Sequence, residues 1–223
     1  MKTVYRRRLT LESTNIFNEF EYHLMNDRKP SEYLNHVLEN TELMEEYPLT
    51  MLADLVDTEQ SPKHHPEGNV WKHTMLVVDN AAEKKEESRN PRAFMWAALL
   101  HDLGKVPTTC VRNGRITAYG HDVEGEKLAG AFLREYIEDE DFIYEVCKLV
   151  RWHMQTFFVV KDMPFADIHS MDEQTSIDEV GLLSLCDRLG RGELDGEKIA
   201  EEKANVVMFL NKSKEYLKNR ELS

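Results

Sequence analysis

The sequence NPRAFMWAALLHDLGK, residues 90–105, contains the most apolar predicted helix of the chain and runs into a histidine–aspartate pair. Asn90 and Pro91 are typical of a helix start, because asparagine caps the first turn and proline fits the first helical position. Residues 94–100 are apolar on every side, so we expect this helix to lie in the core. Gly104 is expected to end it, since glycine readily takes the left-handed turn that terminates helices.

Apolar side chains recur at helical spacing through most of the remaining sequence. Pro30 and Pro48 mark two early helix starts. A long helix is predicted over residues 70–88, capped by Asn69, because residues 61–68 hold two prolines and a glycine and must form a loop before it. Further helices are predicted over 122–137, 140–153, 176–189 and 194–217, with loop or polar segments over 105–120 and 161–175. The predicted fold class is therefore all-α.

Length, composition and charge limit the class of protein. The chain has 223 residues, 41% of them hydrophobic, which is enough for one domain with a real core. Its 41 acidic and 28 basic side chains give a formal charge of −13, whereas duplex-binding proteins normally carry a basic excess. No apolar run approaches the roughly 20 residues that span a bilayer, and the first residues lack the apolar stretch of a secretory signal. We therefore expect a soluble, cytoplasmic protein that binds neither duplex nucleic acid nor membranes.

The His101–Asp102 pair is the first candidate for a functional site. Such a dipeptide is weak evidence by itself, since it occurs again at residues 121–122. Burying an imidazole and a carboxylate at the end of an apolar helix is, however, unfavourable by several kcal/mol unless a partner satisfies them. A divalent cation would satisfy both. The two side chains point about 100° apart, but both can reach one ion beyond the last helical turn.

An ion needs more ligands, and the remaining candidates lie on other predicted helices or near their ends. They are His73, Asp187, His121 and His153. Neutral imidazoles and carboxylates suit Mn, Fe, Co, Ni, Zn or Mg, with open positions for water. The intervals between these residues are too long for a local motif, so periodicity alone does not establish the site.

The order and the amino-acid sequences of these segments resemble those of the HD superfamily of metal-dependent phosphohydrolases. The resemblance rests on HPEGNVWKHT at 65–74, LLHDLGK at 99–105, Gly120-His121, and DRLGRG at 187–192. Over roughly residues 48–192, the sequence most resembles the HD domain appended to bacterial tRNA nucleotidyltransferases, the CCA-adding enzymes. The resemblance implies an all-α HD-domain helical bundle with phosphatase or phosphodiesterase activity on nucleotides. It also implies one divalent metal ion held by His73, His101, Asp102 and Asp187.

The resemblance does not extend to the nucleotidyl-transfer domain of those enzymes. That domain needs a strand-rich region with a Gly-Ser loop, and this sequence has no Gly-Ser dipeptide and no room for such a region. We therefore expect no CCA addition, and a small nucleotide or similar phosphorylated metabolite as substrate. The predicted organisation is an N-terminal helical extension over 1–47, an HD phosphohydrolase core over 48–192, and a long C-terminal helix over 193–223. The apolar stripe of this last helix packs on the core or on a second subunit.

The predicted chemistry is hydrolysis of a phosphate ester by attack of metal-bound water. The ion would lower the pKa of that water and polarise a phosphoryl oxygen, while Asp102 ligates the ion and accepts a proton. Lys105 follows the helix end closely and would contact a phosphate oxygen. Arg188 and Arg191 are the other candidate phosphate ligands, because arginine favours bidentate phosphate contacts.

Several assignments stay open at this level. His121 and His153 either hold a second ion, as in the histidine-rich HD enzymes, or contact the substrate. Two alternatives to a phosphohydrolase stay open: a nucleotide-binding regulatory module without turnover, and a di-iron oxygenase on the same scaffold. The plainest alternative for the four ligands is a set of buried polar side chains satisfied by backbone groups at helix ends.

Overall fold

The computed structural model describes residues 11–40, 42–192 and 194–222. The helices are α1 (Leu11–Asn26), α2 (Pro30–Asn40), α3 (Thr50–Ala53), α4 (Val70–Lys84), α5 (Pro91–Leu100), α6 (Lys105–Thr108), α7 (His121–Arg134), α8 (Glu140–Trp152), α9 (Gln155–Val160), α10 (Ile168–Asp172), α11 (Ile177–Leu189) and α12 (Gly196–Glu221). Single 3₁₀ turns cover Glu42–Glu45 and Lys85–Glu87, and strands β1 (Cys110–Arg112) and β2 (Arg115–Thr117) form a hairpin. The predicted all-α class is confirmed. None of the described helices combines the length and apolar character needed to cross a bilayer.

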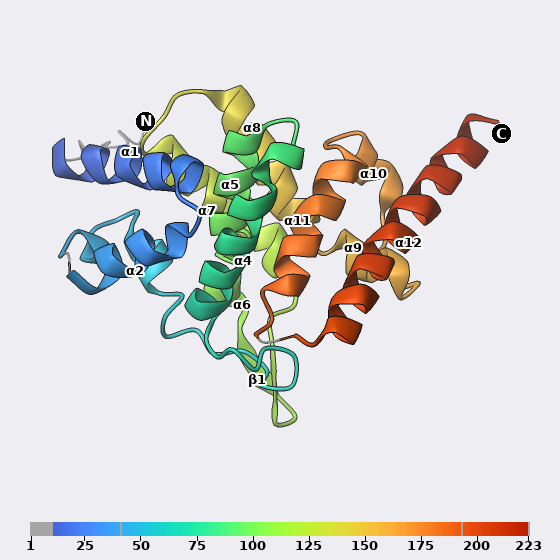
Figure 1. The fold of residues 1–223 in the computed structure, drawn as a ribbon, viewed down its shortest axis with the longest axis horizontal. Helices are drawn as coiled ribbons and strands as arrows, with labels where there is room; N and C mark the ends of the chain where they lie inside the picture. Colours follow the sequence, from blue (N-terminus) through green and yellow to red (C-terminus); the bar gives the residue numbers. More distant parts are fainter. Residues whose placement is uncertain (1–10, 41, 193, 223) are drawn as a thin grey trace, which may run out of the picture.

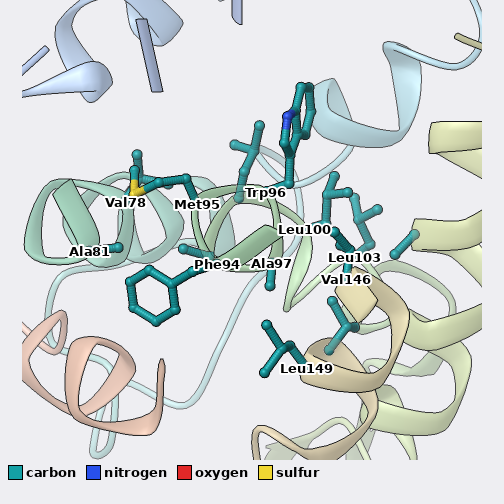
Figure 2. Packing of buried hydrophobic residues seen from close by; sticks show 14 of the residues in the cluster. Val78, Ala81, Phe94, Met95, Trp96, Ala97, Leu100, Leu103, Val146 and Leu149 are labelled. Atoms are coloured by element: carbon teal, nitrogen blue, oxygen red, sulfur yellow. The ribbon is translucent and has the colours of Figure 1, made fainter. Parts of the chain in front are cut away.

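Helix α5 lies at the centre of the fold (Figure 1). All residues from Ala93 to Leu100 are buried, and α5 packs against α1, α4, α8 and α11. Figure 2 shows Ala97 and Leu100 close to Val146 and Leu149 of α8. Because α5 is apolar on every side, contact with four neighbouring helices is the arrangement that removes its surface from water.

The predicted helix starts rest on capping contacts that the structure contains. The Asn90 side chain accepts a hydrogen bond from the backbone N–H of Ala93, and Pro91 is the first residue of α5. Asn69 caps α4 in the same way. Pro30 begins α2 as predicted. These local signals therefore located α4, which carries His73, and α5, which leads directly into His101 and Asp102.

The remaining helices lie on two sides of α4 and α5 (Figure 1). On one side α1 packs on α5 and α2 packs on α4. On the other side α11 packs on α4, and α12 covers α11 and α9. Helices α7 and α8 form a pair, and α8 also contacts α5. The long α12 (red in Figure 1) extends beyond the rest of the bundle toward the C-terminus.

Three segments differ from their predicted structure. Residues 105–120 contain α6 and a β-hairpin, where the sequence predicts a loop with a brief extended stretch. The hairpin turn has Asn113 and Gly114 at positive φ, the conformation that a tight two-residue hairpin requires. The predicted polar segment at 161–175 contains α10. The helix expected from Pro48 begins at Thr50 and covers only four residues.

Gly104 also differs from its predicted conformation. Its φ is −65°, so it is not left-handed and does not act as a terminating glycine. A side-chain carbon at this position would lie 1.9 Å from the backbone oxygen of His121 and 2.5 Å from the backbone nitrogen of Gly125. Glycine is therefore required because the backbone of α7 approaches it closely.

Candidate metal centre

His101 and Asp102 lie in the turn between α5 and α6, and both side chains are buried. Nε2 of His101 is 3.2 Å from Oδ2 of Asp102. The close approach of α7 at Gly104 places His121 beside the same turn, with its Nε2 atom 3.6 Å from Oδ1 of Asp102. The two His-Asp dipeptides of the sequence therefore meet in space.

His73 of α4 and Asp187 of α11 reach the same point, because α4 and α11 pack against each other. Nε2 of His73 lies 3.0 Å from Oδ1 of Asp187 and 3.7 Å from Oδ2 of Asp102. The structure thus brings together the four side chains that the sequence predicts as metal ligands. Their role as ligands stays a prediction.

His153 follows the last residue of α8, and α8 packs on α7. Its Nε2 atom is 3.2 Å from Nε2 of His121 and 4.0 Å from Oδ1 of Asp102. Asp102 therefore lies between two pairs of imidazoles: Oδ2 faces His73 and His101, while Oδ1 faces His121 and His153.

The imidazoles share one orientation. Three of them place Nδ1 on a backbone carbonyl oxygen three residues earlier: His101 on Ala98 at 2.9 Å, His121 on Ala118 at 2.8 Å and His153 on Val150 at 2.6 Å. A carbonyl oxygen only accepts, so each Nδ1 carries the proton. In the neutral ring the Nε2 lone pair is then free to bind a metal ion, and all three Nε2 atoms face Asp102.

His73 reaches the same tautomer through different partners. Its Nδ1 atom faces the backbone oxygen of Gly190 at 3.2 Å and Oε1 of Glu67 at 2.9 Å. Oε1 of Glu67 is also 2.8 Å from Nδ1 of His65. Burial alone would raise the pKa of Glu67, but the hydrogen bonds with His65 and His73 lower it to about 2.

The residue types and their burial fit a divalent metal ion. Ligand atoms within 4.8 Å of one another form three groups among the described residues: His73, His101 and Asp102; Asp102, His121 and His153; and His65, Glu67 and His73. Within the described ranges, Nε2 of His101 and Oδ1 of Asp102 are buried without a hydrogen-bond partner. Such atoms are unfavourable unless something binds them, and an ion would do so.

The two carboxylates are held in their ionised form. Burial alone would raise the pKa of Asp102, but the charges of His101 and Lys105 hold it well below its usual value. Asp187 behaves in the same way: burial acts to raise its pKa, and the charge of Arg191 and the contact with His73 lower it. Ionised carboxylates are the form that binds cations.

The second pair of imidazoles is held neutral. Burial, together with the charges of His121 and His101, lowers the pKa of His153 to about 4. Burial also lowers the pKa of His121. Neutral imidazole is the form of histidine that binds metal ions.

Lys105 is the first residue of α6, and its side chain is mostly buried. Its Nζ atom lies 2.7 Å from Oδ2 of Asp102 and 2.8 Å from Oε1 of Gln60. The amide nitrogen of Gln60 donates in turn to the backbone oxygens of Gly68 and Asn69. Lys105 is therefore fixed beside the carboxylate, in agreement with its expected position just beyond the helix end.

The predicted phosphate ligands Arg188 and Arg191 lie at the C-terminal end of α11 and just beyond it. The Arg188 guanidinium lies over the ring of Phe157, 5.1 Å from its centroid. Arg191 is 3.7 Å from Asp187, and its Nε atom is buried without a hydrogen-bond partner in the described part of the chain.

A cavity of about 920 Å³ opens beside these residues. From the candidate centre its lining includes Asp102, His121, His153 and Asp187, together with Lys105, Arg188 and Arg191. Its aromatic lining includes Tyr119, Phe157, Phe158 and Phe165. Four of the six predicted metal-site residues and the three predicted basic residues therefore line one solvent-accessible cavity, whereas His73 and His101 are not part of its lining.

The sequence interpretation missed three contributors to this site. Gln60 and Glu67 lie in the loop that precedes α4, and Phe157 lies on α9. Glu67 belongs to the HPEG segment on which the family resemblance rests, and that segment was the available signal. No sequence signal marks Gln60 or Phe157, because Gln60 contacts Lys105, 45 residues away, and Phe157 contacts Arg188, 31 residues away.

The fold and the site together define an all-helical protein with a buried histidine–aspartate centre built from separate helices. The model of the HD domain family matches residues 70–192, and the chain belongs to this family. Membership places it in a superfamily of metal-dependent phosphohydrolases, and the residues that can hold an ion lie within or directly before the matched segment. The predicted resemblance is confirmed.

Curated relatives agree with this assignment over part of their length. A multifunctional CCA protein of Actinobacillus pleuropneumoniae is 43% identical over 70 residues, which cover 31% of this chain and 16% of that protein. The protein of the same name from Aromatoleum aromaticum is 48% identical over 72 residues, 32% of this chain and 16% of the relative. The protein of the same name from Halorhodospira halophila is 36% identical over 98 residues, which cover 43% of this chain and 21% of that protein. The matched segments span less than a quarter of these relatives.

Proposed function

We propose that this chain is a metal-dependent phosphohydrolase that cleaves a phosphate monoester or diester of a nucleotide or a similar small phosphorylated metabolite. The observation that carries the proposal is the position of Asp102. Each of its two buried oxygens faces a pair of imidazole Nε2 atoms; Oδ1 has no hydrogen-bond partner among the described residues, and Oδ2 pairs with the Lys105 ammonium at 2.7 Å. A carboxylate in such surroundings is stable when cations bind it.

We assign the ligands in two groups. His73, His101, Asp102 and Asp187 would hold one ion, and Asp102 with His121 and His153 would hold a second. When bound, the ions supply Lewis-acid polarisation of a phosphoryl oxygen and activation of water. The chain contributes imidazoles fixed in the Nδ1-protonated tautomer and low carboxylate pKa values, so little reorganisation accompanies binding.

The basic residues of the cavity are suited to the substrate's phosphate group. Lys105 and Arg191 each lie near a site carboxylate, at 2.7 and 3.7 Å, and so supply local positive charge in a chain of net charge −13. The Arg188 guanidinium lies 5.1 Å from the centroid of the Phe157 ring, and a guanidinium can bind phosphate through two parallel hydrogen bonds. These three residues would orient the ester and balance its charge.

The aromatic lining favours a substrate that carries a base. The rings of Phe157, Phe158 and Phe165 follow one another, with centroids 6.0 and 5.6 Å apart. Phe165 is 60% exposed and lines the cavity. Aromatic faces stack on nucleobases, worth about 1–3 kcal/mol per base. A nucleotide therefore suits this cavity better than a bare sugar phosphate.

Phosphate release from a panel of substrates tests the proposal. The metal-free protein is loaded with Mn²⁺, Co²⁺ or Ni²⁺ and given nucleoside monophosphates, cyclic nucleotides and glycerol phosphate. We expect metal-dependent hydrolysis that is lost on chelation, returns with the ion, and prefers nucleotides. Thermal stabilisation by nucleotides without product would instead support a regulatory module. Iron-dependent consumption of oxygen would support an oxygenase.

A further inference from the structure

Glu67 is a buried carboxylate behind the candidate centre for which the proposed chemistry has no use. Its side chain is 3% exposed, and Oε1 lies within 2.9 Å of two imidazole nitrogens, Nδ1 of His73 and Nδ1 of His65. Oε2 is buried without a hydrogen-bond partner within the described ranges. A carboxylate in this position adds a full negative charge to the side of His73 that points away from Asp187.

The contact with His73 has a direct consequence for the ring. Nδ1 of His73 faces the Gly190 carbonyl oxygen and the Glu67 carboxylate, and both groups only accept hydrogen bonds when Glu67 is ionised. The proton therefore stays on Nδ1, and Nε2 is directed at Asp187 and Asp102. A carboxylate behind a ligating histidine also makes that imidazole a more basic ligand.

His65 completes the arrangement from the cavity side. It lines the cavity, and its Nδ1 atom pairs with Glu67 at 2.8 Å. Two nitrogen donors thus hold the same carboxylate oxygen, which fixes the carboxylate against the His73 ring. The other three imidazoles of the site have a backbone carbonyl in this role, whereas His73 has the Glu67 carboxylate in addition to the Gly190 carbonyl oxygen.

We propose that Glu67 is a positioning residue of the metal centre: held by His65, its carboxylate fixes the orientation of His73 and raises the affinity of the centre for a divalent ion. This inference rests on the proposed function, because it requires that His73 binds an ion. It assigns Glu67 no contact with the ion or the substrate.

Metal affinity measured without any turnover tests the inference. Chelator-treated protein is titrated with Mn²⁺ by calorimetry, and with Co²⁺ while its visible absorption is recorded. We expect Glu67→Gln to raise the Kd about 10- to 100-fold and to change the Co²⁺ spectrum. Glu59→Gln is the matched control, since Glu59 lines the same cavity, is exposed, and loses the same charge. It should stay within about twofold of the unaltered protein.

Each outcome separates the two proposals. If the unaltered protein binds neither ion, the proposed metal centre fails and this inference fails with it. If it binds ions and Glu67→Gln binds them equally well, only the role of Glu67 is overturned. Should Glu67→Gln not fold, as judged by circular dichroism, His65→Phe decides. That variant removes the donor that holds Glu67 and should weaken Co²⁺ binding, and unchanged affinity would refute the inference.

Discussion

A side-chain carbon on Gly104 would lie 1.9 Å from the carbonyl oxygen of His121, so the turn that carries Asp102 and the first turn of α7 touch through their backbones. This contact brings Nε2 of His121 to 3.6 Å from Asp102. It connects the packing of the fold with the composition of the site, because only glycine leaves room for it.

Gly104→Ala is therefore expected to destabilise the protein by more than about 2 kcal/mol, since two backbone segments must separate. It should also weaken metal binding by displacing His121. Urea denaturation measures the first effect and calorimetry the second. Gly196→Ala is the control, because no atom lies within 4 Å of its added carbon. Equal urea midpoints for both variants would contradict the close approach.

Asp102→Ala, and the isosteric Asp102→Asn, should lose metal binding and turnover while remaining folded. The carboxylate faces imidazoles on both sides, and no other described residue supplies oxygens to both pairs. Asp122→Asn is the matched control from the second His-Asp dipeptide, since Asp122 pairs with Arg151 at 2.5 Å instead. It should still bind metal. Full phosphate release by Asp102→Ala would refute the assignment of the site.

His153→Gln should reduce the number of bound ions from two to one per chain. Its Nε2 atom belongs to the Asp102–His121 group and has no part in the His73–His101 group. Elemental analysis of the protein after loading and desalting counts the ions directly. If the unaltered protein holds one ion, as the variant does, and only KM rises in the variant, His153 contacts substrate and the second ion is excluded.

Arg188→Gln should raise KM for a nucleotide substrate about 10-fold or more, because a hydrogen bond to a charged group contributes about 1.5–3 kcal/mol. Metal affinity should not change, since Arg188 lies over Phe157 and makes no described contact within 4 Å with a site carboxylate. Steady-state kinetics and Mn²⁺ titration separate the two effects. Arg89→Gln is the control, because the Arg89 side chain is 72% exposed and Arg89 does not line the cavity. A loss of metal affinity in Arg188→Gln would contradict the assigned role.

The sequence predicts where the helices begin better than it predicts how they pack against one another. Asn90 and Asn69 signal the starts of α5 and α4 through contacts within one turn, and both starts are confirmed. The contact between His73 and Asp187 joins residues 114 positions apart, and it depends on how α4 packs on α11. Apolar periodicity does not specify that packing, so residue types supplied the candidate ligands and only the resemblance to a family grouped four of them around one ion.

Gly104 illustrates the same limit in a single residue. From its local sequence a glycine after an apolar helix indicates a left-handed terminating turn, whereas its φ is −65°. The reason for glycine lies in α7, which the local sequence does not contain. Lys105–Thr108 likewise forms a helix whose first side chain is held by Asp102 and Gln60. Long-range contacts decide both cases.

Acidification of the metal-free protein should lower its stability between about pH 6.5 and pH 4. Burial lowers the pKa of His65 to about 4, although its hydrogen bond with Glu67 opposes the shift, whereas an exposed histidine in the unfolded chain titrates near 6.5. Between these values the unfolded chain binds more protons, so the free energy of unfolding falls as the pH falls. The contribution is fully present at pH 7, and the difference corresponds to at most about 3 kcal/mol.

His65→Gln should flatten this dependence, since glutamine does not titrate and its amide can still donate to Glu67. His36→Gln, on the exposed surface of α2, should leave it unchanged. Urea denaturation in chelator at several pH values measures the slope, and an identical slope in His65→Gln and the unaltered protein would show that His65 is not held neutral by the fold.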